Sequence, residues 1–232
     1  DNPFGKAILT VAEHDGRIVA VNNLWPWEFE IRGSIIKALQ PCDSAVDKDF
    51  RGRGLFKIMR IHGVEIAKER DYSLLFNYPN EMSIKAYMSL GWHFVGKIGW
   101  WVKILKPLMV IKNSFSEDKA KPLEISDAYK LNTDLLDEIV VNSKKYDEFF
   151  KIHRIQGFHK WRYCNHPNRS YGMILYENKI KMRKSAVIFT INQKGNNREM
   201  IIVDIVGQEN DTIQLLKLVV KEARKLNVTM IA

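Results

Sequence analysis

The segment from Val46 to Phe56, VDKDFRGRGLF, joins the end of an apolar run to the start of a helical pattern through a basic, glycine-rich turn. Gly52 and Gly54 allow successive backbone N–H groups to point into one concavity, because no Cβ obstructs them. The first turn of the following helix adds unpaired N–H groups and the positive end of the helix dipole, and Arg51 and Arg53 add charge. This combination predicts an anion site suited to a diphosphate. The alternative is a tight strand-to-helix turn with two solvated arginines.

The same segment resembles the acyl-CoA signature of the GNAT superfamily of N-acyltransferases, Arg/Gln-x-x-Gly-x-Gly/Ala between a strand and a helix. The resemblance implies that acetyl-CoA is the acyl donor, without a metal ion, and that its pyrophosphate is bound by Arg51, Gly52, Arg53, Gly54, Leu55 and Phe56. The sequence departs from the signature at the last position, where Phe56 replaces a small residue. Its ring would either crowd the pyrophosphate or turn into the core.

The resemblance extends to residues 80–92, NEMSIKAYMSLGW, in which Asn80 and Tyr87 match the family's asparagine and tyrosine. In the family, the asparagine supports the pantetheine arm or the adjacent loop, and the tyrosine protonates the departing thiolate. A phenol can do this because its pKa is close to that of the thiol it protonates. For Tyr87 the alternative is an aromatic side chain that only packs within a helix.

Pro41 interrupts residues 34–46, which otherwise predict a strand, and proline is tolerated in a strand only at an edge, a bulge or a splayed position. The fold that the resemblance implies has two neighbouring parallel strands that splay apart around the acyl arm. The backbone from Cys42 onwards would then bind the pantetheine amides, through Ser44, Ala45 and Val46. Asp43 is a candidate base for the acceptor ammonium, directly or through water, and a solvated carboxylate after the proline is the alternative. A buried strand cysteine is favoured over a nucleophile for Cys42, which has no histidine beside it in the sequence.

The elements that would position these residues follow from hydrophobic periodicity. Two short strands at 7–12 and 17–24 are joined by His14-Asp15-Gly16, a strong hairpin signal. Residues 55–70 predict an amphipathic helix, with Lys57, Arg60, Lys68 and Glu69 in the gaps between its apolar residues. A short strand at 73–76, a helix at 80–90 and one or two strands at 92–105 complete the first lobe.

The second half repeats this order of elements weakly. We expect helices at 125–143 and near Lys160, strands at 171–176, 180–192 and 199–206, a helix at 212–226 and a last apolar run at 228–231. Where the first half has its basic turn, the second has Gly207 to Asp211, GQEND, which is acidic and would repel a diphosphate. The predicted fold is therefore α+β, a GNAT-like, mostly antiparallel sheet flanked by helices, in two related lobes. The prediction divides them as a catalytic lobe at 1–105, a linker at 106–124 and a degenerate, incomplete lobe at 125–232.

The overall composition fits a folded protein, with 46% hydrophobic and 27% charged residues among 232. The net charge of +9 favours anionic partners, but Lys and Arg are scattered rather than concentrated on one element, which argues against a nucleic-acid binder. No window has the roughly 18–20 apolar residues of a membrane span, and no signal peptide is recognisable at the first residue, which is not Met. The two cysteines have no metal-site or disulfide spacing, so a reducing, cytoplasmic location is expected.

These observations predict an N-acetyltransferase that moves an acetyl group from acetyl-CoA to an amine of a small molecule or sugar by direct attack. One alternative is a non-catalytic acyl-CoA-binding or interaction module, which the substitution at Phe56 and the degenerate second lobe keep open. Another is an aminoacyl-tRNA-dependent or nucleic-acid-associated protein. The acceptor, the acyl chain length and the oligomeric state are not encoded in any motif of the sequence.

Overall fold

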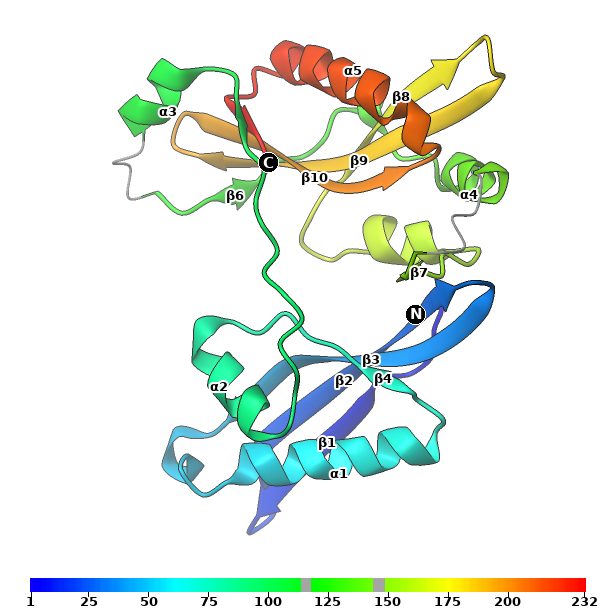
Figure 1. Ribbon diagram of the computed structural model, residues 1–232. Coiled ribbons are helices and arrows are strands. Elements are labelled where there is room, and N and C mark those ends of the chain that lie inside the picture. Colours follow the sequence, from blue (N-terminus) through cyan, green and yellow to red (C-terminus); the bar gives the residue numbers. More distant parts are fainter. Residues whose placement is uncertain (114–117, 144–148) are drawn as a thin grey trace. The chain divides into compact units, whose positions relative to one another are not determined.

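The computed structural model spans residues 1–232 and describes all of them except 114–117 and 144–148. The chain forms two compact units. The first unit comprises residues 1–97 together with 146–153, and the second comprises 98–145 together with 154–232. Each unit has its own sheet and its own helices (Figure 1).

The sheet of the first unit is built from three long antiparallel strands and two short ones: β1 (Ile8–His14), β2 (Arg17–Ile31), β3 (Ser34–Val46), β4 (Leu74–Leu75) and β7 (Lys151–Ile152). β4 pairs with β3 in parallel, and β7 pairs with the far end of β2 in antiparallel fashion. The β1–β2 turn contains Gly16 with a φ of 75°, as the Asp-Gly signal predicts.

Three helical elements complete the first unit: the 3₁₀ turn η1 (Lys48–Phe50), α1 (Leu55–Glu69) and α2 (Glu81–Ser89). α1 runs along one face of the sheet (Figure 1). Its Ala67 packs with Ile8, Leu24 and Leu39 from three strands, all of them buried. This packing holds the C-terminal part of α1 against the sheet to which β3 belongs.

The second unit has a sheet of β5 (Lys103–Ile104), β6 (Lys121–Pro122), β8 (Gly172–Asn178), β9 (Arg183–Lys194), β10 (Asn197–Val206) and β11 (Met230–Ile231). Its helical elements are α3 (Pro107–Asn113), η2 (Asp127–Tyr129), α4 (Thr133–Asn142), the π-helical turn η3 (Lys160–Cys164), η4 (Glu209–Asp211) and α5 (Thr212–Lys225). Alternate residues of β9 serve two cores: Val187 and Phe189 pack with α5, and Ala186 and Ile188 pack with α4. The period of two therefore places a helix on each face of the sheet.

The two units repeat one topology. In each, three antiparallel strands are followed by a 3₁₀ turn, a helix and a short strand that is parallel to the third strand. The α+β class and the mostly antiparallel, helix-flanked sheets predicted from the sequence are confirmed. The division into a catalytic lobe and a degenerate lobe stays a prediction.

The structure also differs from the expected elements in three places. Of the strands expected at 92–105, only Lys103–Ile104 forms a strand, and it belongs to the second unit. The expected linker at 106–124 contains α3 and β6, which also belong to the second unit. The helix expected at 125–143 begins only at Thr133, because Asn132 caps it through the backbone N–H of Leu135.

Candidate functional site

The glycine-rich turn leads directly into α1 and exposes the start of that helix. Gly52 and Gly54 both have a φ of 75°, and no atom lies within 4 Å of where a Cβ would stand on either residue. The first hydrogen bond of α1 runs from the N–H of Ile58 to the carbonyl of Gly54 (3.1 Å), and no side chain caps the helix. The N–H groups before Ile58, from Gly54 to Lys57, are therefore available to an anion.

Both arginines of the turn are exposed and are held against its backbone. Arg51 Nε donates to the carbonyl of Val46 (3.3 Å), and Arg53 Nη2 donates to the carbonyl of Asp49 (3.1 Å). The Arg53 guanidinium also lies over the ring of Phe50, 4.6 Å from its centroid. Backbone carbonyls do not neutralise a guanidinium, so both side chains leave their charge beside the helix start.

β3 is bulged and then unpaired on one edge, next to this turn. Val21 pairs with Ala45 and Asn23 pairs with Cys42, so Asp43 and Ser44 together face Asn22. Parallel pairing with β4 ends at Leu39. Among the described residues, no strand pairs with residues 40–46 on that edge. This is the splayed, bulged strand that Pro41 predicted.

Tyr87 comes from α2 and is buried, with 6% of its surface exposed. Its Oη accepts a hydrogen bond from Arg60 Nη2 (3.0 Å), and its ring meets the ring of Trp92 edge-on at 4.9 Å. Burial raises the pKa of Tyr87 above its ordinary value, the nearby Arg60 lowers it, Cys42 raises it, and a hydrogen bond from the Asn77 side chain lowers it. The prediction of a packed aromatic and the prediction of a proton donor are compatible with this geometry.

The ring of Phe56 turns inwards. It meets the Tyr87 ring edge-on, with centroids 5.8 Å apart, and it lies under the Arg60 guanidinium at 5.2 Å. Phe56 is half-buried, and of the two possibilities that the sequence left open its ring packs inwards against Arg60 and Tyr87.

Arg60 is the residue that sequence reasoning missed. It was placed in the gaps between apolar residues, yet only 1% of its surface is exposed. Its side chain contacts Ser44 Oγ (3.1 Å) on β3, the Tyr87 hydroxyl on α2, and Phe56 one turn earlier on α1. The signal was in the helical phase, because position 60 follows 56 by four residues and precedes 67 by seven, on the buried face.

The predicted site residues therefore fall into two groups. Ser44, Phe56 and Tyr87 are brought together around Arg60. None of the described contacts joins Asp43 or Asn80 to this cluster. Asp43 is exposed at the bulge with a φ of 47°, and the Asn80 side chain caps α2 through the N–H of Ser83 (2.9 Å). Ala45 and Leu55 contribute backbone to the open edge and to the helix start.

In the second unit, the equivalent turn contains a buried carboxylate, that of Asp211. The Asp211 carboxylate lies at the start of α5, is 2% exposed, and accepts hydrogen bonds from Arg183, Asn178 and Ser185. These hydrogen bonds, led by that from Arg183, hold the pKa of Asp211 below its ordinary value against the opposing effect of burial. A charged carboxylate at this position disfavours a second anion, as the acidic composition of the turn predicted.

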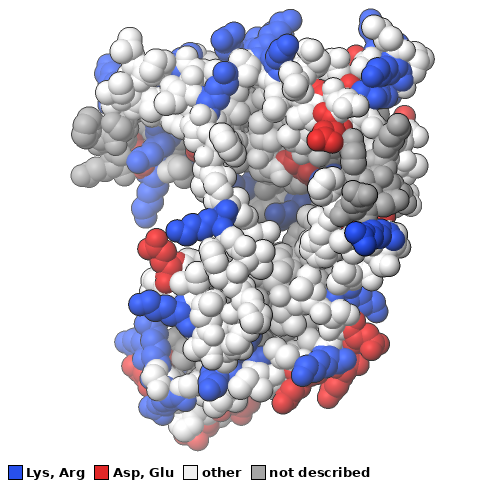
Figure 2. All heavy atoms as spheres, in the orientation of Figure 1, with Lys and Arg blue, Asp and Glu red and all other residues white. Residues whose placement is uncertain are grey.

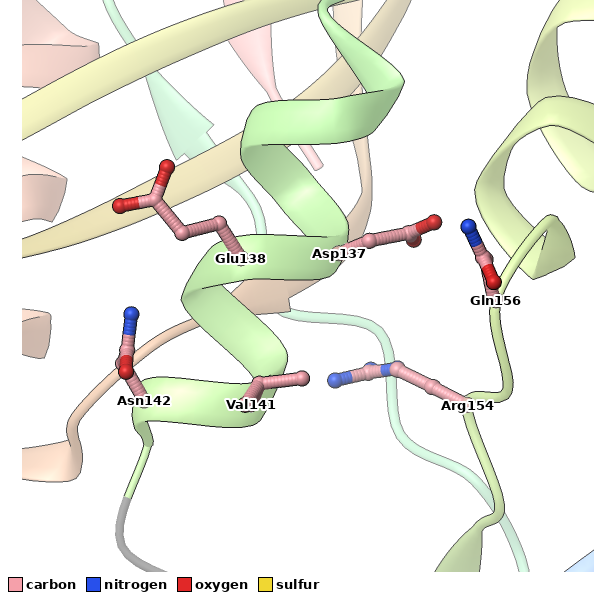
Figure 3. Close-up of a pocket in the computed structure, with 6 residues that line it drawn as sticks. All are labelled: Asp137, Glu138, Val141, Asn142, Arg154 and Gln156. Atoms are coloured by element: carbon pink, nitrogen blue, oxygen red, sulfur yellow. The ribbon is translucent and has the colours of Figure 1, made fainter.

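Two cavities lie elsewhere, both in the second unit. One of about 340 Å³ is lined by Asp137, Glu138, Val141, Asn142, Arg154 and Gln156. Figure 3 shows Asp137, Arg154 and Gln156 converging from α4 and the facing segment. Asp137 and Arg154 already have partners in His159 and Asp204. The other cavity, of about 600 Å³, lies around residues 122–131 and 163–171. The site in the first unit is an open strand edge beside an exposed loop.

The surface charge and the possible ion sites complete the description. On the face shown in Figure 2, Lys and Arg side chains are spread among Asp and Glu and do not form one continuous basic patch. Among the described residues, no group of three or more His, Cys, Asp or Glu side chains is placed to hold a metal ion. In the part of the chain that is described, no helix has the length and apolarity needed to cross a bilayer.

Comparisons with known proteins find one family model and several similar structures. Residues 2–95 match the family model described as Acetyltransferase (GNAT) domain. A probable N-acyltransferase from Enterococcus faecalis matches over 94% of this chain and 52% of its own, with a TM-score of 0.62 and 10% identity, which shows a shared fold. An acetyltransferase from Trypanosoma brucei matches 41% of this chain and 68% of its own (25% identity, TM-score 0.37). For glucosamine-6-phosphate N-acetyltransferase from Arabidopsis thaliana, the match covers 41% of this chain and 66% of its own (19% identity, TM-score 0.37). No curated protein matches the chain.

The chain spans about half the length of the Enterococcus protein and about two thirds of the other two. The family match covers the basic turn, the bulged strand, Arg60 and Tyr87, and it ends at the boundary of the first unit. Residues 2–95 are therefore similar to a GNAT acetyltransferase domain.

Proposed function

We propose that the first unit transfers an acetyl group from acetyl-CoA to an amine of a small molecule or sugar. The turn from Arg51 to Phe56 holds the pyrophosphate through the backbone N–H groups at the start of α1 and the two arginine charges. The open edge of β3 from Cys42 to Val46 pairs with the pantetheine amides. Asn80, as the cap of α2, supports the segment that faces them.

One observation carries this proposal: the open edge of β3 runs directly into a turn whose following helix has free N–H groups. A strand edge offers alternating donors and acceptors to an extended amide chain, and a helix start offers donors to a phosphate. Acetyl-CoA carries both chemical groups, joined end to end. The bulge at Asp43 and Ser44 lies in β3 between the edge proposed for the amides and the turn proposed for the pyrophosphate.

Tyr87 is the proposed general acid. An arginine can only donate hydrogen bonds, so the Tyr87 oxygen must accept the bond from Arg60. The hydroxyl proton is then directed away from Arg60. Tyr87 donates this proton to the sulfur when the carbon–sulfur bond breaks, and positioning of both reactants supplies much of the remaining acceleration. Asp43 accepts a proton from the acceptor ammonium, directly or through water.

The second unit is proposed to bind no cofactor of its own, because the Asp211 carboxylate already places a negative charge at the start of α5. The acceptor is proposed only as an amine. The basic surface favours one that carries a phosphate or a nucleotide, since such an acceptor is attracted by the net charge of +9.

The test combines calorimetric titration of acetyl-CoA with an assay of CoA release over a panel of amines that includes an amino sugar phosphate, a polyamine and a peptide N-terminus. The Tyr87→Phe variant should bind acetyl-CoA as the wild type does and should lose about 100-fold or more in kcat. Binding without turnover of any amine would favour a non-catalytic acyl-CoA module. Failure of the folded protein to bind, together with tight and steeply salt-dependent RNA binding, would overturn the proposal in favour of a nucleic-acid-associated protein.

A further inference from the structure

Arg60 is a buried cation, and no carboxylate of the described residues forms an ion pair with it. Its Nη2 donates to the Tyr87 hydroxyl (3.0 Å) and to Ser44 Oγ (3.1 Å), and its Nε and Nη1 are buried without a hydrogen-bond partner among the described residues. Burying a charge in this way costs several kcal/mol relative to an apolar side chain of the same size. Burial also holds the pKa of Arg60 below its ordinary value. Packing alone does not account for an arginine at this position.

Two aromatic rings offset part of that cost. The guanidinium carbon lies 5.2 Å from the centroid of Phe56 and 5.3 Å from that of Tyr87. A desolvated cation over an aromatic face gains on the order of 1–2 kcal/mol. Phe56, which replaces the small residue of the GNAT signature, is therefore the residue that makes a buried Arg60 tolerable at the next turn of the helix.

Hydrogen bonds extend from Arg60 across three neighbouring strands, β3, β2 and β1. Ser44 Oγ donates to Asn22 Oδ1 (3.3 Å), and Asn22 Nδ2 donates to Thr10 Oγ1 (3.0 Å). Asn22 is buried and stands opposite the bulge of β3. Arg60 thus links the bulge to the Tyr87 hydroxyl, and its position is set from both sides.

We propose that Arg60 is a positioning residue for acyl transfer: it occupies a lone pair of the Tyr87 oxygen, directs the hydroxyl proton towards the leaving sulfur, and stabilises the phenolate that remains. This inference rests on the proposed role of Tyr87 as the acid. When the amine nitrogen has bonded to the thioester carbon, the carbon–sulfur bond breaks and its electron pair goes to sulfur. The Tyr87 proton passes to that sulfur, the nitrogen loses one proton to solvent or base, and the phenolate regains one from solvent.

Burial and nearby charges together decide how acidic Tyr87 is. Burial raises the pKa of its hydroxyl, and the Cys42 thiol raises it further when ionised, whereas Arg60 and the Asn77 side chain lower it. Arg60 contributes the only one of these effects that comes from a positive charge. Removing that charge should move the titration of Tyr87 to higher pH, because the phenolate would lose its counter-charge.

The experiment is a double-mutant cycle on Arg60→Met and Tyr87→Phe, with a titration of Tyr87 in the free protein. Methionine keeps the volume of the site and removes the buried charge, so Arg60→Met should fold, with a melting temperature equal to or above that of the wild type. Its kcat should fall about 10- to 100-fold, while its affinity for acetyl-CoA stays within about threefold. The double variant should be no slower than Tyr87→Phe alone, because both changes remove the same proton transfer.

The titration follows the ¹³Cζ signal of Tyr87, assigned by its loss in Tyr87→Phe, and requires no acetyl-CoA. Its midpoint should move to higher pH in Arg60→Met and should return towards that of the wild type in Arg60→Lys, with and without Cys42→Ala. His62→Ala, on the exposed side of the same helix, is the matched control and should change neither readout.

Three results would overturn the inference: an unchanged Tyr87 midpoint in Arg60→Met, an unchanged kcat, or losses that multiply in the double variant. The result that contradicts the proposed function is a different one. If Tyr87→Phe keeps full kcat, Tyr87 is not the acid, although the titration still reports whether Arg60 controls its proton.

Discussion

Replacing Gly54 by aspartate should weaken acetyl-CoA binding through charge, and the structure offers a matched control for the change in backbone. Gly54 and Gly33 share a φ of 75°, and neither has an atom within 4 Å of a built Cβ. Gly33 lies in the β2–β3 turn, away from the basic loop. An L-residue pays about 1–2 kcal/mol in this conformation, and Asn and Asp pay less than others. The two sites should therefore lose similar stability.

The binding effect separates into strain and charge. Gly54→Asn tests strain, because its side chain has the shape of aspartate without the charge. Gly54→Asp adds a carboxylate at the start of α1, where two charges about 4 Å apart repel by about 1 kcal/mol in water and about 4 kcal/mol at a partly buried site. For an exposed loop we expect about 1–3 kcal/mol, which makes the aspartate variant about 5- to 150-fold weaker than the asparagine variant.

Calorimetric titration with acetyl-CoA at low and high salt measures this difference, with Gly33→Asp and Gly33→Asn treated identically. The gap between Gly54→Asp and Gly54→Asn should narrow as salt rises, because the loop is exposed and the repulsion is screened. The Gly33 pair should show no gap. If Gly54→Asp binds as tightly as Gly54→Asn, the helix start does not hold the pyrophosphate and the reasoning on the loop fails.

Two further predictions concern the second unit. Gly207→Ala should lower the free energy of unfolding of the protein by more than about 2 kcal/mol, because the new Cβ would stand 2.3 Å from Ser185 Oγ and 2.7 Å from the Ser185 Cα at a φ of +129°. Denaturant unfolding measures this loss. Gly157→Ala is the control, because Gly157 also has a positive φ (+83°) but has open space around its built Cβ. The folded-state pKa of Asp211 lies below its ordinary value, so its pair with Arg183 stabilises the fold fully above about pH 4 and this stabilisation is lost as pH falls through the folded-state pKa. Denaturant unfolding between pH 3 and 7 should therefore show a decline in acid that is reduced in Asp211→Asn, and an equal decline in both proteins would contradict it.

Much of the fold could be predicted from local patterns in the sequence. The strand at 34–46 and the helix from Leu55 appear where their periodicity placed them, since each buries one face against the same sheet. The run at 92–105 failed as a strand prediction for the opposite reason. Its aromatic and β-branched residues favour a strand, but a strand also requires a partner edge, and only Lys103 and Ile104 find one, on β11.

The site divides in the same way. The basic turn could be predicted because its chemistry depends on backbone conformation, which glycine and the helix start determine locally. The cluster around Arg60 could not be assembled from the sequence, since Ser44, Phe56 and Tyr87 come from a strand and two different helices. Helical phase indicates that position 60 is buried, but it does not indicate which polar groups of other elements lie beside it.

The sequence by itself determined the basic, glycine-rich turn, the interrupted strand beside it and the order of elements in both halves, because short-range geometry and hydrophobic period encode all three. The tertiary structure alone decided that Phe56 turns inwards, that Arg60 is buried rather than solvated, and that the Tyr87 oxygen accepts its hydrogen bond. Those outcomes depend on which side chains meet across a folded core, where the partner of a charge is fixed by packing between elements that lie far apart along the chain.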